Sequence, residues 1–240
     1  MRKIVATIEA RMTSSRLPGK VLKSAVGMPM LEILIRRLKK VQMINEIVVA
    51  TTINSDDDPV VALAEKLDVG CFRGSENDVL ARVLGAALEY KADVIVEITG
   101  DCPLIDPVIV GQVIDLYLNG NCDYASNVDP VTFPIGMDAQ VFSTQLLQRS
   151  HREGKTPEDR EHVSWYIRHH AKLRRINLPA PQELYWPQLG LTLDEAKDYE
   201  LLKNIVEHFS PDLYFSCGDI LKYLRENLEL LKINQDVARR

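Results

Sequence analysis

Residues 8–22 read Ile-Glu-Ala-Arg-Met-Thr-Ser-Ser-Arg-Leu-Pro-Gly-Lys-Val-Leu, and they separate two predicted elements of regular structure. The apolar, β-branched run that ends at Ile8 predicts a buried first strand. Apolar side chains at helical spacing predict an amphipathic helix over residues 30–41. The stretch is therefore a strand-to-helix loop, and such loops surround the ligand at the carboxyl ends of the strands in an open α/β sheet.

This loop carries three cations, Arg11, Arg16 and Lys20, together with the hydroxyl of Ser14 and the flexible backbone of Gly19. Several cations on one short loop suit a ligand with several negative charges, and a nucleoside triphosphate is the obvious candidate. The pattern is not a Walker A loop, because valine follows Lys20 and the first glycine is missing. A solvated basic loop without a ligand is the alternative.

The rest of the first half alternates β-branched runs with helical patterns. This alternation predicts parallel strands with right-handed crossovers and helices on both faces of the sheet. We therefore expect a Rossmann-like, three-layer α/β/α fold with a mostly parallel sheet. Strands are expected over residues 3–8, 46–52, 69–72 and 93–99, and helices over residues 30–41 and 58–67, from a cap at Ser75 to about residue 88, and over 107–119.

The second half does not continue the alternation of strand and helix patterns, and it starts with an irregular segment over residues 124–138. It lacks a run of core-forming strands of its own, so we expect a single domain over residues 1–240, in which residues 127–188 contain a small β-containing arm or insertion. Strands are expected over residues 138–142, 172–178 and 190–193, and helices over 143–152, 156–168, 195–209 and 216–231.

Composition places the chain among ordinary globular proteins, with 46% hydrophobic and 26% charged residues in 240. A net charge of −5 argues against a dedicated nucleic-acid binder. No apolar run reaches the roughly 18–20 residues of a membrane helix, and the N-terminus lacks a signal-peptide cleavage site. The four cysteines are widely spaced, which favours reduced thiols in the cytoplasm over a zinc site or a disulfide framework.

Two aspartates follow predicted strands at the edge where the basic loop lies. Asp101 belongs to Thr-Gly-Asp-Cys-Pro-Leu over residues 99–104, and Asp194 to Thr-Leu-Asp-Glu over residues 192–195. A carboxylate beside a polyphosphate repels it unless a divalent cation lies between them, and Mg²⁺ is the hard cation that carboxylates and phosphates hold together. The alternatives are that Asp101 binds turn amides and that Asp194 caps the following helix.

These motifs resemble the signatures of the CMP-sugar-acid synthetases, the acylneuraminate and 3-deoxy-manno-octulosonate (KDO) cytidylyltransferases, and most of all the branch named after spore coat polysaccharide biosynthesis protein F. The resemblance implies a nucleotidyltransferase fold whose first loop wraps the base and phosphates of CTP. It implies that Asp101 and Asp194 bind the catalytic magnesium ion. Thr192 departs from the sialate branch, which has a further aspartate there. The implied catalytic residues are Arg11, Lys20 and Asp101, and the implied nucleotide-binding residues of the loop are Ala10, Arg11, Ser14, Arg16, Gly19 and Lys20.

Three further stretches resemble the same family. Arg-Gly-Ser-Glu-Asn-Asp-Val-Leu over residues 73–80 implies that Arg73 and Asp78 lie near the nucleotide, although Ser75 and Asp78 could equally form a helix capping box. The segment from Asn127 through Gly136 and Asp138 is expected to border the acceptor. His162 lies in a stretch that relatives use to reach a partner subunit, so it is expected either at the acceptor or at a homodimer interface.

Together the motifs predict a Mg²⁺-dependent enzyme that moves CMP from CTP to a sugar or 2-keto sugar acid and releases pyrophosphate, for surface glycan biosynthesis. One alternative is a guanylyl- or other nucleotidyltransferase on the same scaffold, since the contacts that read the base in this loop are expected to come largely from the backbone, and the sequence therefore discriminates poorly between bases. The other is a non-catalytic nucleotide-binding protein. The identity of the acceptor sugar is left open.

Overall fold

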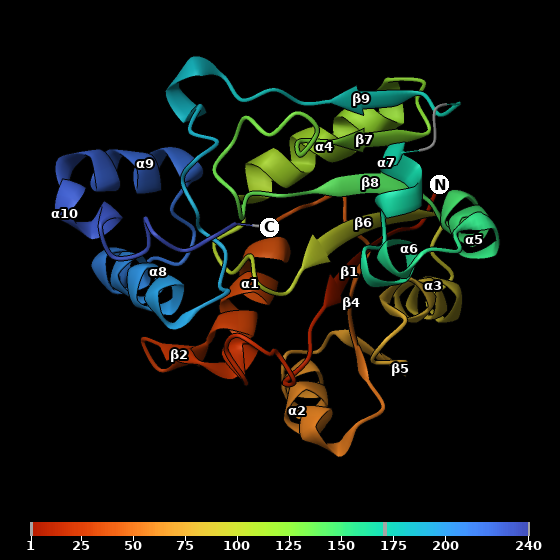
Figure 1. Ribbon diagram of the computed structural model, residues 1–240, viewed down its shortest axis with the longest axis horizontal. Helices are drawn as coiled ribbons and strands as arrows, with labels where there is room; N and C mark the ends of the chain where they lie inside the picture. The colour runs from red at the N-terminus through yellow and green to blue at the C-terminus, as the bar shows by residue number, and fades with distance from the viewer. Residues whose placement is uncertain (1, 170–171, 240) are drawn as a thin grey trace.

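The structure, a computed structural model, describes residues 2–169 and 172–239, and it is built around a seven-stranded sheet (Figure 1). The strand order is β5-β4-β1-β6-β8-β7-β9. The strands are β1 (Ile4–Glu9), β4 (Glu46–Thr52), β5 (Gly70–Gly74), β6 (Val94–Thr99), β7 (Tyr124–Ser126), β8 (Gln140–Ser143) and β9 (Arg175–Asn177), and a separate hairpin pairs β2 (Ser24–Ala25) with β3 (Met28–Pro29).

The sheet is mostly parallel. β5, β4, β1 and β6 run parallel to one another, and only β8 runs antiparallel to its two neighbours, β6 and β7. β1 is central, with Ala6 in register with Ile47 of β4 and Val96 of β6. Because β1 is covered on both faces, it is apolar apart from Thr7 and Glu9.

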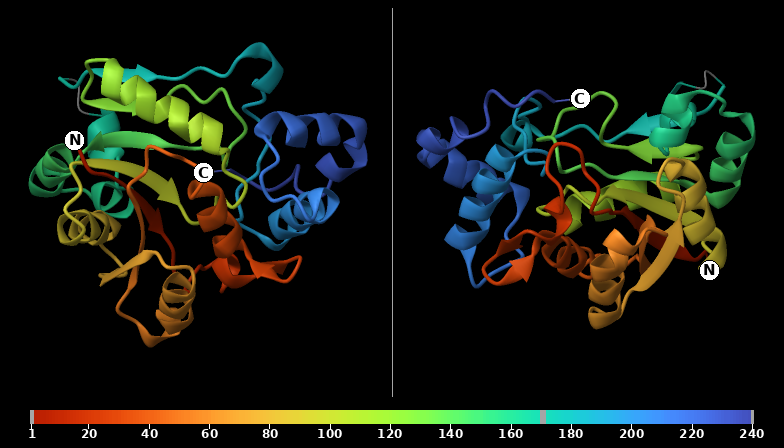
Figure 2. Two further views of the ribbon diagram at one scale, coloured as in Figure 1. Left: turned by 180° about the vertical axis from the view of Figure 1, so that it is seen from behind. Right: turned by 60° about the horizontal axis from the view of Figure 1, so that its bottom comes forward.

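Helices cover both faces of this sheet, which confirms the predicted three-layer α/β/α fold (Figure 2). Apolar side chains of one helix set pack against Ala6 and Val96, and those of the other set pack against Val5 and Ile95. The first set is α1 (Met30–Leu38), α2 (Asp58–Lys66) and α4 (Pro107–Asn119), and the second is α3 (Val79–Glu89), α5 (Thr144–Glu153) and α7 (Trp165–His169). The short helix α6 (Pro157–Glu161) connects α5 and α7, and 3-10 helices lie at η1 (Lys20–Leu22), η2 (Ser55–Asp57) and η3 (Gln182–Leu184).

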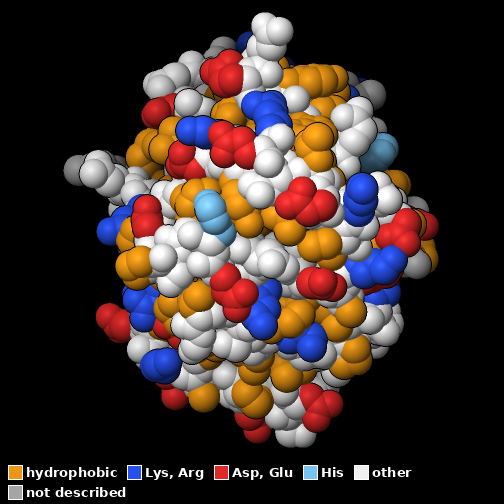
Figure 3. Space-filling model, turned by 90° about the vertical axis from the view of Figure 1, so that its left-hand side faces the viewer, with side chains coloured by type: hydrophobic (Ala, Val, Ile, Leu, Met, Phe, Trp, Pro, Cys, Tyr) orange, Lys and Arg blue, Asp and Glu red, His pale blue; other side chains and the backbone are white. Residues whose placement is uncertain are grey.

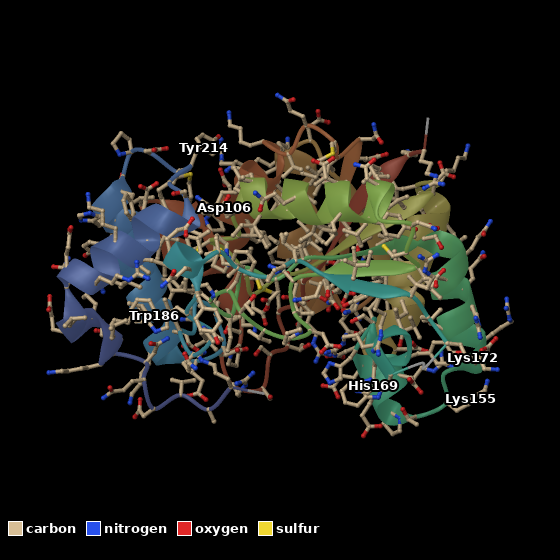
Figure 4. All side chains as sticks on the ribbon, turned by 90° about the horizontal axis from the view of Figure 1, so that it is seen from above. Asp106, Lys155, His169, Lys172, Trp186 and Tyr214 are labelled. Atoms are coloured by element: carbon tan, nitrogen blue, oxygen red, sulfur yellow. The ribbon has the colours of Figure 1, made fainter. Side chains whose placement is uncertain are left out.

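Three C-terminal helices, α8 (Ala196–Phe209), α9 (Cys217–Glu226) and α10 (Leu228–Leu231), form a lobe at one end of the sheet (Figures 1 and 2). Their apolar cluster includes Met30 and Ile33 of α1. Asp106, labelled in Figure 4, joins the lobe to α4, because its carboxylate accepts from the backbone N–H of Val108 at 2.8 Å and of Cys217 at 2.7 Å. The surface of this lobe intersperses charges of both signs (Figure 3).

A buried arginine makes the second connection between lobe and sheet. Arg37 of α1 has no exposed surface, and its guanidinium donates to the backbone carbonyls of Leu104, Ile105, Leu213 and Phe215. Burial lowers the pKa of this guanidinium to about 10, which still leaves it charged at neutral pH. Arg37 therefore fastens the loop after β6 to the segment that leads into α9.

Several elements differ from the sequence expectations. The helix expected from a cap at Ser75 begins later, because Asp78 is the cap and accepts from the N–H of Ala81 at 2.8 Å. The single helix expected over residues 156–168 is interrupted between α6 and α7, and the helix over 216–231 breaks at Asn227. The strand expected over 190–193 is only an isolated bridge between Ile135 and Gly190. β7 was not expected, since three residues carry too little periodicity to be recognised.

Among the helices of residues 2–169 and 172–239, none combines the length and the apolar character that a bilayer span requires.

Candidate active site

Lys20 lies between two aspartates that come from distant parts of the chain. Its Nζ is 2.9 Å from Oδ2 of Asp101, in the turn after β6, and 3.2 Å from Oδ1 of Asp194, just before α8. The N–H of Leu193 also donates to the carbonyl of Asp101 at 2.8 Å, which holds the two aspartate segments against each other. The structure thus brings together three of the predicted site residues at the carboxyl edge of the sheet.

Arg16 adds a second cation to this group, with Nη2 2.8 Å from Oδ1 of Asp194. Burial alone would lower the pKa of Lys20, but the charges of Asp101 and Asp194 outweigh it and raise that pKa. Burial would raise the pKa of Asp101, yet Lys20 and the hydrogen bonds of Asp101 lower it. Lys20 and Asp101 are therefore both charged at neutral pH.

The carboxylate of Asp194 faces Lys20 because it is not used to cap α8. Glu195, and not Asp194, caps α8, and it shares a capping box with Asp198. Asp198 is fully buried and accepts from the N–H groups of Asp194 at 3.2 Å and Glu195 at 2.9 Å. The expectation that Asp194 caps the helix is therefore wrong, because the carboxylate four residues further on binds these amides.

Gly19 positions Lys20. It caps η1 in the left-handed conformation, with φ +67°, and its N–H donates to the carbonyl of Met12 at 2.8 Å. The hydroxyl of Ser14 accepts from the N–H of Leu17 at 3.4 Å, inside the same loop. Ala10 is buried at the end of β1, where its N–H donates to the carbonyl of Ala50. These three residues act on the shape of the loop.

Arg11 points to a different carboxylate, Glu76. Its Nη1 lies 3.2 Å from the carbonyl oxygen and 3.6 Å from Oε1 of Glu76. Glu76 also accepts from the hydroxyl of Thr13 and, at 2.6 Å, from Nδ2 of Asn54, and these two bonds lower its pKa. Glu76 was not among the predicted site residues, although it lies in the motif over residues 73–80 that contains the predicted residues Arg73 and Asp78.

Those neighbours have structural partners. Arg73 donates to the carbonyls of Thr52 at 2.8 Å and Asn54 at 2.7 Å and pairs with Asp58 at 2.7 Å, so it fastens the loop after β4. Asp78 caps α3, and its second oxygen lies 3.5 Å from Nη1 of Arg160. Their predicted contacts with a nucleotide stay predictions.

The predicted acceptor-binding residues divide into two groups. Asn127 is buried, and its amide group binds the backbone of Met137 at 2.6 Å and of Ala139 at 2.8 Å, so it shapes the loop that carries Asp138. Burial raises the pKa of Asp138 to about 6, the N–H of Gly136 opposes this shift, and the charge of Asp101 adds to it.

Gly136 and His162 lie at different places. Gly136 has φ +106°, and a Cβ atom there would lie 2.7 Å from the carbonyl group of Leu191, close to the Asp194 segment. His162 is exposed at the end of α6, with its ring centroid 5.7 Å from that of Trp165. The structure does not join His162 to the Lys20 group.

Two carboxylates around one positive charge suit a hard divalent cation. Asp101 and Asp194 already share the Lys20 ammonium, so they can offer oxygens to a Mg²⁺ ion whose other ligands are phosphate oxygens and water. A complete protein cage is not present, because the described residues contain no group of three His, Cys, Asp or Glu side chains arranged for a metal. The donor set therefore fits Mg²⁺ that arrives with a phosphorylated ligand.

Comparison with known proteins gives the same picture. A sequence model of the cytidylyltransferase family matches residues 5–234. Spore coat polysaccharide biosynthesis protein SpsF of Bacillus subtilis is 32% identical over 233 residues, which cover 95% of this chain and 96% of that protein. A solved cytidylyltransferase structure from Leptospira borgpetersenii has a TM-score of 0.91 at 34% identity and covers both chains fully.

A more distant solved structure shares the fold. It is CMP:2-keto-3-deoxy-manno-octonic acid synthetase complexed with CTP, with a TM-score of 0.64 at 18% identity over 86% of this chain and 99% of that one. The match to the family model and the similarity to SpsF confirm the resemblance drawn from the motifs. The chain belongs to the cytidylyltransferase family and is a nucleotidyltransferase.

Proposed function

We propose that this protein is a Mg²⁺-dependent enzyme that transfers CMP from CTP to a sugar or 2-keto sugar acid and releases pyrophosphate. The observation that carries the proposal is the convergence of Lys20 and Arg16 with Asp101 and Asp194 at the carboxyl edge of the sheet. Cations and hard oxygen donors at one point are what a triphosphate with its metal needs. The names of SpsF and of the CTP-bound synthetase support CTP and a polysaccharide-related sugar.

In the proposed reaction, an acceptor hydroxyl attacks the α-phosphorus of CTP. A new oxygen–phosphorus bond forms, the bond to the β-phosphate oxygen breaks, and pyrophosphate and one proton leave. Lys20, Arg16 and Arg11 would bind the phosphates and stabilise the charge that builds on them in the transition state. Mg²⁺ held by Asp101 and Asp194 would neutralise phosphate charge.

The direct test is pyrophosphate release with one nucleoside triphosphate at a time, with and without Mg²⁺, against a panel of 2-keto sugar acids and sugar phosphates. We expect release with CTP, only when Mg²⁺ and one acceptor are present. Asp101→Asn should lower the rate by roughly 10²-fold or more. Asp115→Asn is the matched control, because Asp115 is an exposed residue of α4.

Other outcomes would change the assignment. Release with GTP alone would make the protein a guanylyltransferase on the same scaffold. Binding of CTP without pyrophosphate release for any acceptor would favour the non-catalytic alternative. The predicted homodimer, the arm over residues 127–188 and the cytoplasmic location stay predictions, and light scattering of the purified protein tests the first of them.

A further inference from the structure

One face of the sheet holds a concentration of unsatisfied polar atoms. Among the described residues, five buried side-chain atoms lack a hydrogen-bond partner, and four of them are Thr7 Oγ1, Glu9 Oε1, Glu97 Oε2 and Arg168 Nε. The fifth, on Thr51, belongs to the opposite face by strand alternation. Since nearly all buried polar groups in folded proteins find a partner, four orphans in one place point to a missing ligand.

The strands place these atoms together. In the parallel pair of β1 and β6, Thr7 is in register with Glu97, and Glu9 with Thr99. They share the face of Val5, which the α3, α5 and α7 layer covers. Glu97 is only 4% exposed, so its free oxygen is not satisfied by bulk water.

The neighbours of Glu97 are polar, but Oε2 of Glu97 has no hydrogen-bond partner among them. The hydroxyl of Ser164 and the guanidinium of Arg168 both lie close enough to lower the pKa of Glu97. Gln140 of β8 is in register with Glu97, but its Oε1 already accepts from the hydroxyls of Tyr124 and, at 2.7 Å, Ser164. Arg168 belongs to α7. The last residue of α7, His169, is labelled in Figure 4 at the end of the molecule away from Trp186. Side chains of β1 and β6 together with α7 thus form a polar patch, which consists of Thr7, Glu9, Glu97 and Arg168.

The patch adjoins the active site, because the N–H of Gly100, the residue before Asp101, donates to the carbonyl of Glu9 at 2.9 Å. Burial raises the pKa of Glu9 well above its ordinary value, the charges of Glu97 and Asp101 add to this shift, and Arg82 opposes it. Glu9 therefore lies within the electrostatic reach of both Glu97, deep in the patch, and Asp101, at the candidate metal site.

We propose that Glu9, Glu97 and Arg168 form the acceptor subsite, and that it binds the neutral, hydroxyl-bearing part of the acceptor sugar. This inference rests on the proposed function and specifies its acceptor. A hydroxyl donates to a carboxylate oxygen and also accepts from a guanidinium N–H, so adjacent hydroxyls satisfy both kinds of orphan atom. A carboxylate has no hydrogen to donate to the unpartnered oxygens of Glu9 and Glu97, and an ammonium group could accept nothing from Arg168.

The test compares Glu97→Gln with Glu89→Gln, which makes the same change of a carboxyl to an amide at an exposed position at the end of α3. For the acceptor selected by the pyrophosphate assay, we expect Glu97→Gln to raise KM roughly tenfold to a hundredfold, the cost of leaving a buried hydrogen-bonding group of the complex unpaired. The Kd for CTP, measured by calorimetry without acceptor, should stay unchanged. Glu89→Gln should change neither quantity.

Stability separates a binding role from a structural one. Because Oε2 of Glu97 lacks a hydrogen-bond partner in the free protein, Glu97→Gln should leave the melting temperature equal or higher. An unchanged acceptor KM would overturn the proposal, and so would a lower melting temperature with weaker binding of both substrates.

A binding experiment keeps the inference testable where turnover fails. The melting temperature of the wild-type protein is measured with neutral hydroxylated sugars, 2-keto sugar acids and amino sugars. The proposal expects a rise with at least one hydroxylated compound that Glu97→Gln abolishes. A rise confined to amino sugars, or no rise with any of these compounds, would overturn it, whereas absent pyrophosphate release alone would count only against the proposed function.

Discussion

Lys20 and Asp101 are 81 residues apart in the chain, and their side chains meet at 2.9 Å. Asp194 is 174 residues from Lys20 and completes the group at 3.2 Å. One ammonium thus serves two carboxylates at the edge of the sheet. In the free protein it keeps the aspartates together, and a phosphate group that binds Lys20 would release both of them for a cation.

Replacing Lys20 should therefore damage the site more than a lost surface charge would. In Lys20→Met, Asp101 and Asp194 face each other without their shared cation, so the pKa of Asp101 should rise. We expect pyrophosphate release to fall roughly 10²-fold or more and CTP to bind more weakly. Steady-state kinetics and calorimetry measure these changes. Lys222→Met, at an exposed position of α9, is the control, and equal behaviour of the two variants would contradict the assignment.

Asp194 and Asp198 lie four residues apart and should respond differently to the same substitution. Asp194→Asn should abolish most activity with little loss of stability. Asp198 is fully buried and also binds Asn234 and Arg239, both at 2.8 Å, so Asp198→Asn should lower the free energy of unfolding by about 3–5 kcal/mol. Urea unfolding and kinetics of both variants check this contrast. A large stability loss in Asp194→Asn would show that its main role is structural.

Gly136→Ala should strain the loop between Asn127 and Asp138. The φ of +106° and the close carbonyl of Leu191 both exclude a side chain, so we expect a loss of at least about 1–3 kcal/mol in unfolding free energy. Acceptor KM should rise as well, because the displaced loop carries Asp138. Gly218→Ala is the control, since a Cβ atom there meets only ordinary contacts at 3.5 Å. Equal stability of both variants would argue against strain at Gly136.

Stability should fall as the pH rises through the neutral range. Burial raises the pKa of Glu97 from 4.5 to about 8, with Arg168 opposing the shift. Between these values the folded protein binds more protons than the unfolded chain, so the free energy of unfolding decreases with increasing pH. Glu97→Gln should flatten this slope without abolishing it, because Glu9 contributes in the same direction. Melting temperatures from pH 5 to 9 provide the measurement, and identical slopes for the variant and the wild type would refute this origin.

Much of the fold and part of the site could be predicted because they depend on local pattern and topology. The strand over residues 46–52 was expected with its observed bounds, since its β-branched run is uninterrupted. The meeting of Lys20 with Asp101 follows from the rule that loops after parallel strands share one edge.

The remaining features depend on contacts between distant residues. The local sequence does not show whether Asp194 caps the helix or binds Lys20. Asp198 decides this, because its carboxylate accepts from the N–H of Asp194. Likewise, Glu9 and Glu97 read as ordinary strand residues, and only the pairing of β1 with β6 reveals that buried oxygens of both lie on one face.

Arg37 has a consequence for how the molecule opens. A helical lobe that rests on a sheet through apolar contacts alone can detach while the sheet stays folded. Here detachment would break the bonds of Arg37 to Leu213 and Phe215 and leave a charged group half-satisfied in the interior. Amide protons in α8 and α9 should accordingly exchange with the same free energy as those in β1 and β6. The lobe and the sheet then unfold together. This coupling holds Asp194 next to the sheet edge that carries Asp101 even when no ligand is bound.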